Sequence, residues 1–394
     1  MREQGCPICE SDRSDLFFSI DRQPVTIGVL YPDPESARQC AMGDLQLVYC
    51  RSCGFIFNRA FNPADMDYTE EYDNSLHFSP TYQDYARSTA QGLIDRYQLR
   101  NKNVIEIGCG KGDFLVQFCE MGNNKGVGFD PSYAGPRTES PAIDQIEFIR
   151  EYYDATTGKG YPADLICSRY VLEHVPQPVQ FLSGLCSAFA DGVEPVLFFE
   201  VPNAHDILSQ LSVFGIIYEH CSNFGANALQ NCFSRAGFKM LRQESTYQNQ
   251  FLTIESRWSG KPADPAEGLE TGELEETGRL VAAFGEEFRK KTDGWKETLE
   301  RFEHEGRRVV MWGAGAKGVG FTNMLGIHQQ IEYMVDINPN KQGKCLAGTG
   351  QRIVPPEFLS EVKPDVIILM NEIYAAEIRK VTDGLGLKVE FLAA

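Results

Sequence analysis

Short apolar runs alternate with amphipathic stretches through the middle of the chain. The stretches 112–122 and 178–190 repeat their apolar residues at helical spacing. The apolar runs between them have the length and composition of buried strands, and they are NVIEI (103–107), GVGFD (126–130), ADLICS (163–168) and PVLFFEVP (195–202). Strands that alternate with helices in this way predict a parallel sheet connected by crossover helices.

The pattern changes on both sides of this region. Residues 1–70 are rich in turns, and residues 259–278 are rich in Gly, Pro and acidic residues. A stretch with apolar residues at near-helical spacing follows, and a second, smaller strand–helix alternation begins near residue 306. We therefore predict an α/β chain that contains a small N-terminal domain (1–70), a central Rossmann-like domain (71–256), a linker with an amphipathic helix (257–305) and a smaller C-terminal Rossmann-like domain (306–394).

Composition and charge narrow the class of protein. The hydrophobic fraction of 42% and the charged fraction of 23% are typical of a soluble globular chain. The formal net charge of −18 argues against nucleic acid as a partner, since phosphate binding needs a basic face. No apolar run approaches the roughly 20 residues that span a bilayer, and the first residues lack an apolar signal core. We expect a cytoplasmic protein that acts on a small molecule and not at a membrane, and the oligomeric state stays open.

Four of the twelve cysteines form two Cys-x-x-Cys pairs, Cys6 with Cys9 and Cys50 with Cys53. Two such turns can place four thiolates around one zinc ion in a tetrahedron. In a cytosolic chain this spacing favours a metal over disulfides. A closed shell of four cysteines leaves no position for a substrate, so we predict a structural zinc. Two reduced pairs without metal are the alternative.

A glycine-rich turn follows the first central strand. Gly108, Gly110 and Gly112 form G-x-G-x-G, and glycine lets the backbone approach a ligand closely. Glu106 lies in the strand just before the turn, and Asp130 ends the next strand, where it can accept hydrogen bonds from ribose hydroxyls. The spacing differs from the G-x-G-x-x-G fingerprint of dinucleotide-binding proteins. A Rossmann domain for another nucleotide remains the alternative.

These features resemble motif I and the acidic loop of class I S-adenosylmethionine (SAM) methyltransferases. The stretch ADLICSRYVLEHV (163–175) is similar to the fourth strand of that class and the motif after it. The resemblance implies a SAM site made by Glu106, the three glycines, Asp130 and the adjacent Pro131. It also implies that His174 shapes the wall of the donor pocket, and a catalytic role for Glu173 and His174 is the alternative.

Nearly the whole chain resembles the sugar C-methyltransferases, which act on nucleotide-linked keto-deoxysugars. The segment EEYDNSLHFSPTYQDYA (70–86) is similar to the Tyr-x-Asn-Ser segment that closes over the donor in that family, which implies SAM contacts for Tyr72 and Ser75. GAGAKGVGFTNMLG (313–326) and VDINPNKQGKCLAGT (335–349) are similar to the signature of its C-terminal domain. The resemblance implies an N-terminal zinc domain, SAM as cofactor and a nucleotide-sugar acceptor.

The run IIYEHCSNFG (216–225) carries the candidate catalytic residues. Methylation beside a ketone requires removal of an α-proton and stabilisation of an enolate, and His is a natural base for this step. His220 matches the position of the base in the family. Glu219 is expected to orient that imidazole or hold a sugar hydroxyl, and Tyr218 to donate to the enolate oxygen. Asn203, after the strand that ends in FFEVP, is a candidate acceptor contact.

The run also departs from the family. Sugar enzymes tend to read Tyr-His-Glu-His, whereas this chain reads Ile-Tyr-Glu-His at 217–220. Two alternatives therefore stay open. Glu219 and His220 could merely cap the next helix, and the enzyme could methylate oxygen, nitrogen or a carbonyl acceptor that is not a sugar.

A second glycine turn lies in the C-terminal part. Gly313, Gly315 and Gly318 match G-x-G-x-x-G, and Asp336 ends the next strand, so a dehydrogenase is one interpretation. Only a short sheet follows, which argues against a full dinucleotide-binding domain. Lys317 could meet a diphosphate beside a helix N-terminus, and a packing role for the domain is the alternative.

Overall fold

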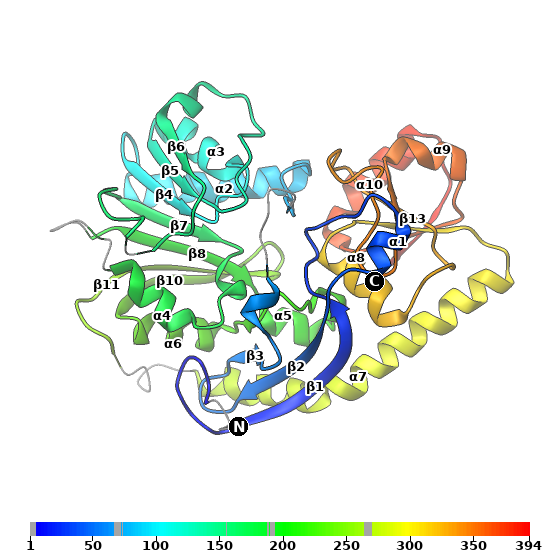
Figure 1. The fold of residues 1–394 in the computed structure, drawn as a ribbon, viewed down its shortest axis with the longest axis horizontal. Helices are drawn as coiled ribbons and strands as arrows, with labels where there is room; N and C mark the ends of the chain where they lie inside the picture. Colours follow the sequence, from blue (N-terminus) through cyan, green and yellow to red (C-terminus); the bar gives the residue numbers. More distant parts are fainter. Residues whose placement is uncertain are drawn as a thin grey trace.

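Three β-sheets organise the chain in the computed structural model, which describes residues 5–66, 72, 74–154, 156–186, 189, 194–263 and 270–394. The seven-stranded sheet and the five-stranded sheet stand side by side, and the four-stranded sheet lies beneath them (Figure 1). Among the described helices, none combines the length and the apolar character needed to cross a membrane.

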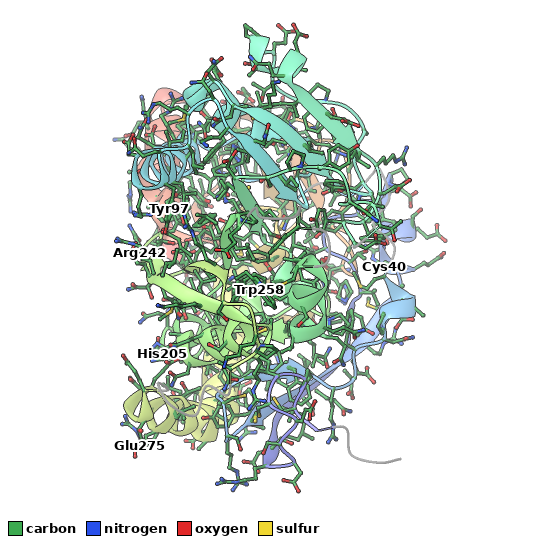
Figure 2. All side chains as sticks on the ribbon, turned by 90° about the vertical axis from the view of Figure 1, so that its left-hand side faces the viewer. Cys40, Tyr97, His205, Arg242, Trp258 and Glu275 are labelled. Atoms are coloured by element: carbon green, nitrogen blue, oxygen red, sulfur yellow. The ribbon has the colours of Figure 1, made fainter. Side chains whose placement is uncertain are left out.

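The central sheet has the order β10-β11-β8-β7-β4-β5-β6. Its strands are β4 (Asn103–Ile107), β5 (Lys125–Phe129), β6 (Ile146–Ile149), β7 (Leu165–Arg169), β8 (Val196–Pro202), β10 (Phe238–Thr246) and β11 (Phe251–Trp258). Strands β4 to β8 are parallel, and β11 and β10 add an antiparallel edge. The predicted parallel sheet is confirmed. Figure 2 shows this edge, with Arg242 on β10 and Trp258 at the end of β11.

Helices cover both faces of this sheet. They are α2 (Pro80–Tyr97), α3 (Asp113–Gly122), α4 (Pro178–Leu185), α5 (Ala204–Ser209) and α6 (Ala226–Arg235). Neighbouring residues of β4 belong to the hydrophobic cores on opposite faces of the sheet. Val104 packs with α2 and α3, whereas Ile105 packs with α4 and α6. This explains the continuous apolar runs in the sequence, because β4, β7 and β8 are buried on both faces. The helix predicted over 178–190 ends at Leu185, and 187, 188 and 190 lie outside the described residues.

The C-terminal sheet is parallel throughout, with the order β14-β13-β12-β15-β16. Its strands are β12 (Val309–Trp312), β13 (Tyr333–Val335), β14 (Arg352–Val354), β15 (Val366–Leu369) and β16 (Glu390–Ala393), and its helices are α8 (Ala316–Leu325), α9 (Leu359–Val362) and α10 (Ala375–Gly384). The second strand–helix alternation is therefore confirmed as a smaller Rossmann-like unit.

The N-terminal sheet and one long helix join the other two sheets. The sheet contains β1 (Ser14–Pro24), β2 (Met42–Cys50), β3 (Ile56–Asn58) and β9 (Ser222–Asn223), and α1 (Pro34–Arg38) precedes β2. Helix α7 (Thr271–His304) runs beneath both halves of the molecule along β1 (Figure 1). Phe18 of β1 packs edge-on against Phe284 and Phe288 of α7, so the predicted apolar stripe of this helix is a packing face.

Strand β9 comes from the segment that carries the candidate catalytic residues. It pairs with β3, with Phe57 opposite Ser222 and Ile56 opposite Asn223. The end of the Tyr-Glu-His run is therefore fixed to the N-terminal sheet, although the run belongs to the central part of the sequence. The division of the chain at residue 70 stays a prediction, because 67–71 lie outside the described residues.

Candidate active site

A cavity of about 700 Å³ lies between the central and C-terminal sheets. The first glycine loop, after β4, and the second, after β12, both line it. Both loops follow the carboxyl ends of parallel strands, which is where open α/β sheets bind ligands. The cavity therefore faces two nucleotide-type loops at once.

The first loop is held by Asp130, at the end of β5. One carboxylate oxygen of Asp130 accepts a hydrogen bond from the backbone N–H of Gly110 at 2.8 Å, and the other accepts one from Ser132 N at 2.7 Å. Gly110 has φ of 56°, and a Cβ atom placed there would meet no protein atom within 4 Å. The open space above Gly110 belongs to the cavity, so the backbone can approach a ligand there.

The other two glycines act differently. A Cβ at Gly108 would come within 2.2 Å of Val171, so close packing requires glycine at that position. A Cβ at Gly112 would collide with the Phe148 ring at 2.7 Å, and Gly112 is not among the cavity-lining residues. The predicted ligand contact of Gly112 does not fit this structure, since its role is to begin α3.

The three residues of the Tyr-Glu-His run point to different places. The Tyr218 side chain is 1% exposed and is not part of the cavity lining. Its hydroxyl accepts a hydrogen bond from Asn62 N at 2.9 Å and donates one to Asp65 at 3.0 Å. The role predicted for Tyr218, donation to an enolate oxygen, stays a prediction, and in this structure its hydroxyl is hydrogen-bonded outside the cavity lining. Consecutive residues point to different sides here because the run crosses from the central sheet to the N-terminal sheet.

Glu219 is also outside the cavity lining. Its carboxylate accepts hydrogen bonds from Ile27 N at 2.8 Å and from the Tyr72 hydroxyl at 2.9 Å. Burial raises the pKa of Glu219 to about 7, and these two hydrogen bonds oppose that rise. Its nearest imidazole is that of His174, with Nδ1 at 3.7 Å from Oε2. Glu219 therefore holds Tyr72 and approaches His174, and its predicted role, to orient His220 or hold a sugar hydroxyl, stays a prediction.

His220 does line the cavity, beside His174 and Glu173. The two imidazole rings meet edge to face, with their centroids 5.0 Å apart. Burial lowers the pKa of His220 well below its usual value, and the neighbouring His174 lowers it further. Among the described residues, none forms a hydrogen bond with the His220 imidazole. A neutral imidazole with a free lone pair therefore faces the cavity.

The second glycine loop repeats the geometry of the first. Asp336, at the end of β13, accepts from Ala314 N at 2.9 Å and from Asn338 N at 2.8 Å, as Asp130 does in the first loop. Lys341 donates to Ala314 O at 3.0 Å. The Asn338 side chain is 1% exposed and lines the cavity, and its Nδ2 lacks a hydrogen-bond partner among the described residues.

Contacts between the two halves shape the cavity, and the sequence did not indicate them. Glu377 on α10 accepts hydrogen bonds from Ser79 at 2.8 Å and from Thr81 at 3.0 Å, at the N-terminus of α2. Tyr247 and Tyr374 join the same halves through their hydroxyls at 2.9 Å. These pairs are separated by more than a hundred residues, so local pattern carries no signal for them.

A buried ion pair supports the cavity wall and was also missed. Arg169 donates to Glu200 at 2.6 Å and to the Tyr82 hydroxyl at 2.8 Å. Arg169 is 6% exposed and Glu200 0%, so each charge depends on its partner. Charged residues inside two buried strands were the available signal, because such residues are rarely buried unless they are paired.

Comparisons with known proteins agree with this arrangement. Residues 82–243 match a family model described as a methyltransferase domain, and residues 270–386 match one described as a C-methyltransferase C-terminal domain. The chain is 25% identical to the C-methyltransferase NovU of Streptomyces niveus over 399 residues, which cover 95% of this chain and 90% of that protein. Over nearly its whole length the chain is similar to a C-methyltransferase. It is a SAM-dependent methyltransferase.

Solved structures similar to this methyltransferase cover less than half of it. Magnesium protoporphyrin IX methyltransferase (ChlM) from Synechocystis PCC 6803, solved with bound SAH, is 17% identical, covers 45% of this chain and 84% of its own, and has a TM-score of 0.35. A SAM-dependent methyltransferase from Aquifex aeolicus is 12% identical, covers 43% and 88%, and has a TM-score of 0.31.

The residues of the methyltransferase around the first loop suit SAM. Glu106 is 3% exposed and lines the cavity, and its Oε2 has no hydrogen-bond partner among the described residues. Burial raises the pKa of Glu106 to about 8. A buried carboxyl without a partner fits a cationic ligand, and SAM carries an ammonium and a sulfonium. Pro131 also lines the cavity, so these residues fit the cofactor.

Of the remaining predicted contact residues of the methyltransferase, some line the cavity and one does not. Tyr72, Ser75 and Lys317 line the cavity, and Ser75 donates to Asp113 at 3.2 Å. Asn203 does not line it, because its amide caps α5 by accepting from His205 N and donates to Asn249 O. The predicted acceptor contact of Asn203 stays a prediction, and in this structure its amide is occupied by these two hydrogen bonds.

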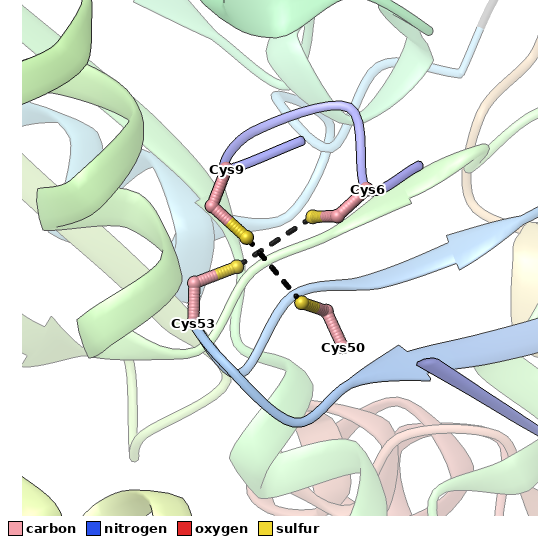
Figure 3. A group of neighbouring side chains, drawn as sticks. All are labelled: Cys6, Cys9, Cys50 and Cys53. Atoms are coloured by element: carbon pink, nitrogen blue, oxygen red, sulfur yellow. Dashed lines mark hydrogen bonds between the residues drawn. The ribbon is translucent and has the colours of Figure 1, made fainter. Parts of the chain in front are cut away.

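The four cysteines meet as predicted. The Sγ atoms of Cys6 and Cys53 lie 3.6 Å apart, and those of Cys9 and Cys50 lie 3.5 Å apart (Figure 3). These separations exceed a disulfide bond of about 2.05 Å. They are close to the roughly 3.8 Å between thiolates that share a tetrahedral zinc ion with bonds of about 2.3 Å. The donor set therefore fits zinc.

Proposed function

We propose that this methyltransferase transfers a methyl group to a carbon next to a carbonyl group, through an enolate. The observation that carries the proposal is the His220 imidazole, which is neutral, free of hydrogen bonds to the described residues and exposed to the cavity. SAM, when bound at the first loop, supplies an electrophilic methyl group on a positively charged sulfur. The protein must then supply a carbon nucleophile.

His220 is the proposed base. Its imidazole would take the α-proton of the acceptor, and the electron pair of the C–H bond would remain on the acceptor as an enolate. Burial makes the imidazolium costly, which is why a nearby anion matters. Glu173 lies beside His220 in the cavity lining. Its pKa is raised to about 8, so its carboxyl would stabilise the protonated imidazole once it has lost its own proton. The proton would leave to solvent after the methyl group has been transferred.

The proposed acceptor is a nucleotide-linked keto-deoxysugar. The resemblance of the whole chain to sugar C-methyltransferases supports this, as does the second glycine loop. Lys317 lies in the first turn of α8, is half-buried and lines the cavity. A lysine beside a helix N-terminus suits the two negative charges of a diphosphate. The cavity reaches from the first glycine loop to Lys317, so a donor at the first loop and a diphosphate at the second would share it.

We also propose that the four cysteines hold a structural zinc ion. Four thiolates close the coordination shell, so the ion would stabilise the N-terminal sheet and have no part in methyl transfer. Cys50 ends β2, and this sheet holds the strand after His220. Zinc would thus act on catalysis only through the position of the base.

Methylation at oxygen or nitrogen, or of an acceptor that is not a sugar, is the second candidate. This candidate is favoured by the position of Tyr218 outside the cavity lining, since the run 216–225 then provides no phenol to bind a sugar enolate.

The experiment incubates the purified enzyme with SAM and several nucleotide-linked 4-keto-6-deoxyhexoses. The proposal predicts a mass gain of one methyl group, with the NMR shifts of a C–CH3 group. An O–CH3 or N–CH3 product would support the second candidate. No methylation of any sugar, in protein shown to bind SAM, would contradict a sugar acceptor.

A further inference from the structure

Three metal-ligating side chains meet in the cavity away from the four cysteines. One ligand atom each from Glu173, His174 and His220 lies within 4.8 Å of the others. All three residues line the cavity, so a small ion from solvent can reach them. Glu173 and His174 come from η3 (Leu172–His174), after β7, while His220 precedes β9. Two separate loops therefore bring this group together.

One carboxylate oxygen of Glu173 lacks a hydrogen-bond partner among the described residues. Its side chain is 2% exposed, and its Oε2 is buried without a hydrogen bond to any described residue. Burial, with a smaller contribution from the carboxyls of Glu200 and Glu219, raises the pKa of Glu173 to about 8 against the effect of a backbone hydrogen bond. A buried carboxyl surrounded by other carboxyls is strained when ionised, and a cation relieves that strain.

Both imidazoles are available as neutral ligands. Burial lowers the pKa of His174 to about 4, and a hydrogen bond to the Glu219 backbone opposes this fall. The Nδ1 atom of His174 lies on the Glu219 side, 3.7 Å from its carboxylate. A carboxylate beside one imidazole nitrogen is typical of metal-bound histidines. His220 has no hydrogen bond to a described residue that would compete.

We propose that Glu173, His174 and His220 form a second metal site, which takes a divalent transition-metal ion such as Zn²⁺, Co²⁺ or Ni²⁺. Two imidazoles and one carboxylate are ligands that these ions prefer. The ligand atoms of one such ion lie about 3 to 3.5 Å apart. Side-chain movements of about 1 Å would therefore bring the three ligand atoms into this range. A carboxylate cluster that favours Mg²⁺ or Ca²⁺ would contain more oxygen ligands.

The site has a consequence for catalysis, and this consequence rests on the proposed function. A metal ion and a proton would compete for the same lone pair of His220. Bound metal would therefore inhibit proton abstraction, and a chelator would restore it. Metal binding itself does not depend on the identity of the acceptor.

The test adds Co²⁺ to the full-length enzyme after its four-cysteine site has been loaded with zinc. We expect one further equivalent to bind, with ligand-field absorption bands but without thiolate-to-cobalt charge-transfer bands. Glu173→Gln should weaken this binding about 10- to 100-fold or more. Glu106→Gln removes another unpartnered carboxyl from the same cavity and serves as the matched control, which should bind Co²⁺ as the wild type does.

Each outcome is decisive. No further Co²⁺ in the wild type, a thiolate spectrum for the added ion, or equal binding by Glu173→Gln would overturn the proposal. Circular dichroism of each variant verifies that it is folded, and His220→Asn replaces Glu173→Gln if the latter does not fold. If Co²⁺ binds but no sugar is methylated, the metal site stands and the proposed function fails. If a sugar is methylated but Co²⁺ does not bind, the proposed function stands and the metal site fails.

Discussion

SAM binding should depend on the protonation of Glu106. This carboxyl is buried, its Oε2 has no hydrogen-bond partner among the described residues, and burial raises its pKa to about 8 from the ordinary 4.5. Near pH 6 to 7 it is therefore mostly protonated. A cationic ligand binds the ionised form, so SAM must displace the proton.

The size of the effect follows from the pKa. Well below a pKa of 8, the ionised fraction rises about tenfold per pH unit, so the Kd of SAM should fall about tenfold from pH 6 to pH 7, or about 1.4 kcal/mol. About 0.9 proton should be released per SAM bound at pH 7, if the bound carboxyl is fully ionised. The ammonium of SAM keeps its charge over this range, because α-amino groups titrate near pH 8.

Isothermal titration calorimetry in buffers of different ionisation enthalpy measures both quantities. In Glu106→Gln the Kd should be weaker at pH 7 and nearly independent of pH. Glu173→Gln is the matched control, because its carboxyl also has a raised pKa but lies beside His220. A pH-independent Kd in the wild type, or an unchanged slope in Glu106→Gln, would refute the reasoning.

The same pKa shift predicts the direction of a stability effect. The folded protein binds the Glu106 proton more tightly than the unfolded chain does, since its pKa is raised. This contribution to stability is complete below about pH 4.5 and is lost as the pH rises through about 8. Without SAM, Glu106→Gln should therefore gain thermal stability relative to the wild type between pH 6 and pH 8.5. An opposite change in the Tm difference would contradict the raised pKa.

Three further substitutions separate structural roles from catalytic ones. Cys6→Ser should lose zinc by metal analysis and lower the Tm by several degrees, and an unchanged metal content would argue against the zinc site. Gly110→Ala places a methyl group in the open cavity at a positive φ, which costs about 1 kcal/mol, and should weaken SAM binding more than tenfold while circular dichroism stays native. Tyr218→Phe should leave kcat within about twofold but destabilise the fold by about 1 to 2 kcal/mol in urea titrations, because only the hydrogen bonds to Asn62 and Asp65 are lost. A hundredfold loss of kcat would instead support a catalytic role for Tyr218.

The sequence was a good guide wherever the relevant contacts are local. Alternating strands and helices predicted both parallel sheets, because crossover connections leave a period that can be read directly. Gly108 and Gly110 have positive φ, which only glycine adopts easily, so the loop carried its own signal. The cysteine pairs were equally clear, since the Cys-x-x-Cys turn already places two of the four thiolates together.

The sequence was a poor guide to the direction of individual side chains in the site. Tyr218, Glu219 and His220 are consecutive, yet only His220 faces the cavity, because the short pairing of β9 with β3 orients the run. Asn203 follows a strand that ends at the cavity but caps α5 instead. The missing hydrogen bonds of Glu106 and Glu173 depend on burial by distant segments, which spacing along the chain does not reveal.

The most direct test of the central claim is hydrogen exchange beside the ketone in D2O, without SAM. The wild type should exchange the α-hydrogen of a nucleotide-linked 4-keto-6-deoxyhexose for deuterium and, when SAM is added, should place a methyl group on that carbon. His220→Asn should bind SAM with unchanged affinity and lose both reactions. Exchange or methylation by His220→Asn at a rate near that of the wild type would contradict the account.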